Sequence, residues 1–133
     1  RQRIATAVKF RLKQNESNRE AIRAALSFLL LPRNALVSAK CLYRTVDTIW
    51  FGVGDKSTDF NFYTKRSLLA AAYTSTLIYW LDDQSFETQD TWAFLDRRLN
   101  DIVNFGQTSA RVKAKLPSLD LLSKIWMSRE KRA

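Results

Sequence analysis

Glycine and proline are rare in this chain, and their scarcity limits the folds available to it. The 133 residues contain three glycines and two prolines, whereas a sandwich or barrel needs turn residues between seven or more short strands. The sequence therefore predicts an all-α fold. A chain of this length buries roughly two-thirds of the surface that its unfolded form exposes, so one hydrophobic core is expected.

Apolar residues spaced three and four apart indicate where the helices lie. We expect helices at residues 2–13, 18–31, 33–53 and 59–81, and a fifth from about residue 88. Ser17 or Asn18 is expected to cap the second helix and Thr88 the fifth, and Gly106 to end or kink the fifth. Cys41 lies in the periodic run of the third helix, so we expect it to be a small core side chain.

The positive charge of the chain is concentrated at its two ends. The formal net charge is +9, and residues 1–14 hold five bases and no acid. Residues 111–133 hold seven bases against Asp120 and Glu130. This distribution favours attraction to a polyanion, either a phosphate backbone or an anionic lipid surface. Solvated helix faces would give the same pattern.

The sequence offers few of the usual arrangements for catalysis. Histidine is absent and one cysteine is present, which removes the commonest general base and excludes an intrachain disulfide or a cysteine-based zinc cluster. The sequence holds no glycine-rich phosphate loop and no nucleophile elbow. We therefore expect neither an enzyme nor a bound cofactor or metal.

The last segment, residues 117–133, is predicted to be an amphipathic helix. Its apolar residues share one face at 100° per residue, and bases follow at its end. This pattern is typical of a helix that lies in a lipid headgroup region, although the same face could instead close a bundle or a dimer. The expected membrane-binding residues are Leu119, Leu121, Leu122, Ile125 and Trp126.

A long motif follows the third predicted helix. It reads Gly54-Asp55-Lys56-Ser57-Thr58-Asp59-Phe60-Asn61-Phe62-Tyr63-Thr64-Lys65-Arg66. Leu29–Asn34 and Val46–Trp50 upstream and Thr91–Arg98 downstream extend the match to about residues 4–115. With this motif the chain resembles the accessory lipid-binding proteins of ubiquinone (coenzyme Q) biosynthesis, the ninth member of the Coq series.

The resemblance implies an all-α bundle similar to the ligand-binding domain of TetR-family regulators over residues 1–116, followed by the amphipathic helix 117–133. It implies a non-catalytic protein that binds an isoprenoid quinone intermediate or a phospholipid in an internal apolar pocket. The protein would present this ligand to the demethoxyubiquinone di-iron hydroxylase, the seventh Coq protein, at a membrane surface. That surface would be the cytoplasmic face of a bacterial inner membrane or the matrix side of the mitochondrial inner membrane. The family's N-terminal helix-turn-helix-like region is not found in this sequence.

Two sets of site residues are expected. For the pocket we take the inward members of the strongest apolar stripes, which are Leu42, Val46, Trp50, Leu69, Tyr73, Leu77 and Trp92. The resemblance implies that the hydroxylase is contacted by Asp47, Ile49, Asp59, Phe62, Tyr63 and Arg66. Phe62 stands where human-like members of the family have tryptophan, and Ile49 where many members have methionine, so the contact differs in size at both positions. From spacing alone, Tyr63 would lie toward the core.

Two other classes of protein fit parts of the sequence. One is a helical dimerisation or scaffold module that binds no lipid, and the other is the effector-binding domain of a TetR-like transcription regulator. The sequence contains no visible recognition helix, so we expect no nucleic-acid partner. A homodimer is left open.

Overall fold

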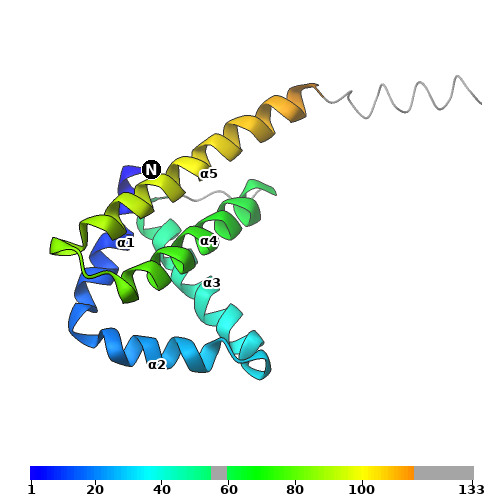
Figure 1. Cartoon of the computed structure of the whole chain (residues 1–133). Coiled ribbons are helices and arrows are strands. Elements are labelled where there is room, and N and C mark those ends of the chain that lie inside the picture. The colour runs from blue at the N-terminus through cyan, green and yellow to red at the C-terminus, as the bar shows by residue number, and fades with distance from the viewer. Residues whose placement is uncertain (55–59, 116–133) are drawn as a thin grey trace, which may run out of the picture. The chain divides into compact units, whose positions relative to one another are not determined.

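The fold is all-α, as the sequence predicts. The computed structural model describes residues 1–54 and 60–115 (Figure 1). Within these ranges the chain forms five α-helices: α1 (Gln2–Gln14), α2 (Arg19–Leu29), α3 (Ala35–Gly52), α4 (Phe60–Asp82) and α5 (Gln89–Lys115). Single 3-10 turns at Glu16–Asn18, Pro32–Asn34 and Phe86–Thr88 precede α2, α3 and α5. The chain divides into two units, residues 1–102 and 103–133, and the core and grooves described below belong to the first.

The core of the first unit is built from four of the helices. The apolar residues of α1 recur every four positions, which places them on one face of the helix, and that face is buried. Helices α3, α4 and the first half of α5 bury their own stripes in the same cluster. The largest members are Val8, Leu12, Val46, Ile49, Trp50, Leu69, Tyr73, Trp80, Leu95 and Leu99.

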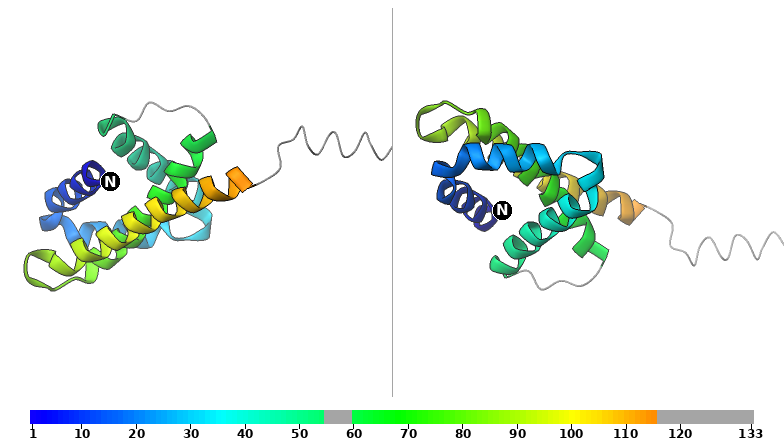
Figure 2. Two further views of the ribbon diagram at one scale, coloured as in Figure 1. Left: turned by 90° about the horizontal axis from the view of Figure 1, so that it is seen from above. Right: turned by 90° about the horizontal axis from the view of Figure 1, so that it is seen from below.

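Helix α2 differs from the others because none of its residues is buried. It runs along the bottom of the unit in Figure 1, next to the start of α3, and it passes in front of the green α4 when the unit is seen from below (Figure 2, right). Leu31 adopts an extended conformation before Pro32, because proline disfavours the helical region for the residue that precedes it. The break predicted between the helices at residues 18–31 and 33–53 is therefore confirmed.

Three expected helix signals turn out differently. Asn18 occupies the cap position of α2 but makes no side-chain capping hydrogen bond. Thr88 does not cap α5, because it adopts a left-handed φ of 56° within the preceding turn. Gly106 neither ends nor breaks α5, which continues to Lys115. A single glycine costs a helix only about 1 kcal/mol, too little to interrupt a helix that is otherwise favourable.

Two burial predictions are wrong. Cys41 is exposed, because it lies in the first half of α3, where the helix has little cover. Tyr63 is also exposed, with 68% of its surface open to solvent. Helix α4 is apolar nearly all round, so spacing alone could not tell which of its faces would be covered.

Among the described residues, no single helix is long and apolar enough to span a membrane. The pair Glu16–Leu29 and Pro32–Gly52, bent by 93°, meets the criteria of length and composition when taken together.

Candidate functional site

An open groove of about 750 Å³ lies between α1 and the second half of α3. Ile49 is buried in its wall and Phe10 is exposed at its edge. Ile49 faces this groove because it lies about 200° around α3 from Asp47. The lining residues are Gln2, Arg3, Thr6, Ala7, Phe10, Arg11, Gln14, Thr48, Ile49, Gly52 and Val53.

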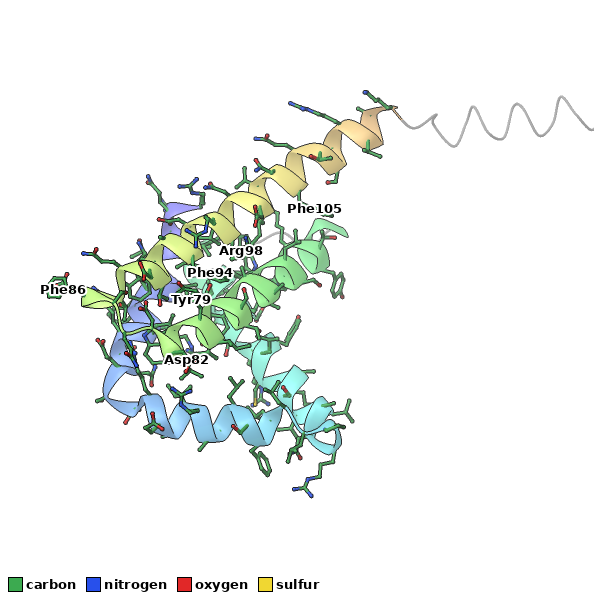
Figure 3. The ribbon with its side chains drawn as sticks, in the orientation of Figure 1. Tyr79, Asp82, Phe86, Phe94, Arg98 and Phe105 are labelled. Atoms are coloured by element: carbon green, nitrogen blue, oxygen red, sulfur yellow. The ribbon has the colours of Figure 1, made fainter. Side chains whose placement is uncertain are left out.

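A second open cavity, of about 540 Å³, lies where α4 ends and α5 begins, and it is more polar. Asp82, Asp83 and Asp90 line it together with Ile78, Tyr79, Gln84 and Ser85. The rings of Tyr79 and Phe94 stack above this corner, with their centroids 4.7 Å apart (Figure 3). Asp82 points away toward α2, where its Oδ1 accepts a hydrogen bond of 2.8 Å from Arg23 (Figure 3).

The Asp83 carboxylate connects the end of α4 to the start of α5 through hydrogen bonds. Its Oδ1 accepts a hydrogen bond of 2.8 Å from the Ser85 backbone N–H, and its Oδ2 accepts one of 2.9 Å from the backbone N–H of Thr91. The Thr91 hydroxyl also donates to Oδ2. Burial raises the pKa of Asp83, but these hydrogen bonds favour the carboxylate more strongly and lower its pKa to about 2. The carboxylate therefore caps α5, the role that the sequence predicted for Thr88.

The seven residues predicted to line a lipid pocket belong to the packed core. None of them lines the groove between α1 and α3 or the cavity between α4 and α5. Four of them are buried in the core cluster: Val46, Trp50, Leu69 and Tyr73. Leu42, Leu77 and Trp92 pack against that cluster and are partly buried. Their contact with a lipid remains a prediction.

The residues predicted to contact the hydroxylase are not all on one surface. Arg66 is buried and donates from Nε and Nη2 to Oδ1 of Asp47, at 3.1 and 3.0 Å, which ties α4 to α3. Asp47 itself is half-exposed, and Tyr63 projects into solvent. Asp59 and the side chain of Phe62 lie outside the described residues.

Phe51 is a further exposed residue of α3, close to Asp47, that sequence reasoning did not select. It lies four residues after Asp47, hence on the same face of α3, and 76% of its surface is exposed. We define the α3–α4 patch as Asp47, Phe51 and Tyr63, with Arg66 buried beneath it. The i, i+4 spacing from Asp47 was the available signal for Phe51.

The five residues predicted to bind a membrane, Leu119 to Trp126, lie outside the described residues. Within residues 1–54 and 60–115, no three histidine, cysteine, aspartate or glutamate side chains come close enough to hold a metal ion. This part of the chain offers other molecules an apolar groove between α1 and α3, a more polar cavity between α4 and α5, and the α3–α4 patch.

Comparison with known proteins identifies the family. The family model for COQ9 matches residues 35–106. The ubiquinone biosynthesis protein COQ9, mitochondrial, of Rattus norvegicus is 43% identical over 111 residues, which are 84% of this chain and 36% of the relative. Its Homo sapiens counterpart is 42% identical over 111 residues, 84% of this chain and 35% of the relative. The probable ubiquinone biosynthesis protein coq9, mitochondrial, of Dictyostelium discoideum is 37% identical over 103 residues, 77% of this chain and 34% of the relative.

The chain thus spans about a third of the length of these curated relatives. The family model covers more than half of the chain, and the matched residues include the α3–α4 patch and Asp83, which caps α5. On this evidence the chain belongs to the COQ9 family.

Proposed function

We propose that this chain serves ubiquinone biosynthesis as a non-catalytic lipid-binding accessory protein. It binds an isoprenoid quinone intermediate at a membrane surface and presents it to the demethoxyubiquinone di-iron hydroxylase. The names of the relatives support the pathway and a mitochondrial location. Within the mitochondrion, the proposed place of action is the matrix side of the inner membrane. The corresponding location in a bacterium is the cytoplasmic face of the inner membrane.

The observation that carries this proposal is the groove between α1 and α3. Its volume of about 750 Å³ falls within the range of small-molecule sites, about 300–1,000 Å³. Ala7, Phe10, Ile49 and Val53 give it an apolar wall, which shields an isoprenoid tail from water. Because the groove is open along one side, a bound quinone leaves its head group accessible to an enzyme.

The groove and the α3–α4 patch lie on opposite faces of the same stretch of α3. Ile49 and Gly52 belong to the groove, while Asp47 and Phe51 belong to the patch. A hydroxylase docked on the patch is therefore held within one helix diameter, about 10 Å, of the bound substrate. The docked enzyme and the bound substrate are then neighbours, with α3 between them.

Filling the groove tests lipid binding. Gly52 lines the groove, and a Cβ added there would meet nothing within 4 Å, so Gly52→Phe starts its side chain in open space. Gly106→Phe is the matched control, because a Cβ at Gly106 also meets nothing within 4 Å and Gly106 does not line the groove. Lipid extraction and mass spectrometry of the purified proteins should show several-fold less isoprenoid quinone with Gly52→Phe and no change with Gly106→Phe. Equal loads in both variants, or an empty wild-type protein, would favour a scaffold module.

Docking of the hydroxylase is tested at the patch. Tyr63→Ala removes an exposed ring from the patch, and Tyr43→Ala removes an exposed tyrosine from another part of α3. Calorimetric titration with the purified hydroxylase should show at least tenfold weaker binding for Tyr63→Ala, the size expected for an interface anchor. Tyr43→Ala should bind like wild type. The α3–α4 patch is not the docking surface if both variants bind equally.

A further inference from the structure

The turn between α2 and α3 exposes five large apolar side chains. Leu30 is 64% exposed and Leu36 is 79% exposed. Phe28, Leu31 and Val37 add to the same surface, and α2 buries none of its residues. We call these five residues the α2–α3 corner, which lies at the lower right of Figure 1. A contiguous exposed apolar surface of this kind marks a site of interaction.

The backbone of the corner is fixed by its own hydrogen bonds. Asn34 Nδ2 donates to the carbonyl oxygen of Phe28 at 2.8 Å, and the Asn34 N–H donates to that of Leu31 at 2.9 Å. The Leu30 N–H donates to the carbonyl oxygen of Leu26 at 2.9 Å, and Pro32 has no N–H to satisfy. Because these backbone groups already have partners, moving them into an apolar medium carries less of the cost of burying unpaired polar groups.

The charges around the corner are all of one sign. Residues 21–46 contain Arg23, Arg33, Lys40 and Arg44 and no acid. Arg23 is engaged with Glu20 and Asp82, and the other three bases are exposed. A second copy of this chain would place bases against bases across a symmetric contact. An anionic bilayer instead attracts the bases while its acyl region accepts the apolar side chains.

We propose that the α2–α3 corner inserts into the headgroup region of an anionic membrane. The inference extends the membrane location in the proposed function, and it rests on residues that belong to neither the groove nor the α3–α4 patch. It is independent of the predicted membrane helix at residues 117–133. Leu30, Leu31, Leu36 and Val37 enter the bilayer, and Arg33 and Lys40 contact lipid phosphates.

The only cysteine of the sequence provides a site for a dye that detects this insertion. Cys41 is exposed and lies four residues after Val37, on the same face of α3. An environment-sensitive nitrobenzoxadiazole dye attached to Cys41 should shift to shorter emission wavelength and gain intensity at least twofold when vesicles are added. The vesicles contain equal amounts of phosphatidylcholine and phosphatidylglycerol. Protein that binds only through residues 117–133 would float with the vesicles while its dye remained in water, which would overturn the proposal.

Two matched valine substitutions complete the test. Val37 and Val112 are each 53% exposed, and Val37→Glu places an acid at the corner whereas Val112→Glu places one on α5. Val37→Glu should abolish the dye response and lower the fraction of floated protein at least threefold. Val112→Glu should keep both within twofold of wild type. Equal effects of the two substitutions, or no effect of Val37→Glu, would contradict insertion at the corner.

Lipid extraction separates this inference from the proposed function. Val37→Glu should retain the co-purifying quinone that Gly52→Phe loses, because Val37 does not line the groove. If Gly52→Phe loses quinone while the dye at Cys41 never responds to vesicles, the carrier role stands and the proposed insertion of the α2–α3 corner is wrong. A dye response in a protein that carries no quinone would leave the corner correct and the carrier role wrong.

Discussion

Replacement of Asp83 by asparagine should destabilise the protein in a way that depends on pH. The carboxylate accepts hydrogen bonds on both oxygens, from Ser85 on one side and from Thr91 on the other. An asparagine side chain keeps only one oxygen acceptor, so one set of these donors loses its partner. Leaving a buried donor unpaired costs about 1–3 kcal/mol.

The lowered pKa gives a second and independent measure of the same contribution. The pKa falls from 3.8 to about 2 on folding, and each pKa unit corresponds to about 1.36 kcal/mol, so the ionised carboxylate stabilises the folded state by about 2 kcal/mol. Because the folded pKa is the lower one, this stabilisation is complete above about pH 4 and is lost as the pH falls toward 2. About half of it should remain at pH 3.

Urea unfolding followed by far-UV circular dichroism, at pH 7 and at pH 3, measures this contribution. Asp83→Asn should lower the free energy of unfolding by about 2 kcal/mol at pH 7 and by about half as much at pH 3. Asp82→Asn is the matched control. Asp82 is exposed and contributes one pair with Arg23, so the loss of stability at pH 7 should be much smaller. A loss for Asp83→Asn that stays the same at both pH values would refute the capping role of the carboxylate.

The remaining predictions concern stability and are checked by the same unfolding measurement. Leu69→Ala should cost about 2–5 kcal/mol, because Leu69 is fully buried in the core cluster. Arg66→Met should cost about 1–3 kcal/mol, since it removes two hydrogen bonds from a buried guanidinium to the Asp47 carboxylate; an unchanged stability would show that this pair does not hold α4 to α3. Glu87→Gly should raise stability by about 0.5–1 kcal/mol, because Glu87 is exposed and adopts a left-handed φ of 51° that glycine tolerates better.

The helices and most of the core follow from local patterns that the sequence carries. The apolar residues of α1 repeat every four positions and those of α3 every three or four, and this spacing matches the buried faces that carry Val8, Leu12, Val46 and Trp50. The pattern is uninformative where a helix is apolar on all sides. Tyr63 on α4 is exposed for this reason, although its spacing pointed inward.

The site depends on information that no local pattern contains. The groove exists because α1 and α3 lie side by side, which depends on the packing of both helices against α4 and α5. The cap of α5 comes from Asp83, eight residues before Thr91, and a turn with two left-handed residues had to form before they could meet. Cys41 fits a core pattern by type and position, yet it is exposed, since burial also requires a neighbouring element to cover it.

Helix α3 contributes residues to the groove, to the α3–α4 patch and to the α2–α3 corner. The length of α3 therefore sets the distances between these three sites. Leu36 at its start and Ile49 near its end are thirteen residues apart, and a helix rises 1.5 Å per residue, so roughly 20 Å separates them. With the corner in the headgroup region, the groove can therefore stand as far as roughly 20 Å from the bilayer. A quinone with a tail shorter than this span leaves the membrane completely on entering the groove, whereas a longer tail keeps its far end in lipid. Short-tailed quinones should accordingly be extracted from vesicles into solution by the protein, and long-tailed ones should remain with the vesicles while bound.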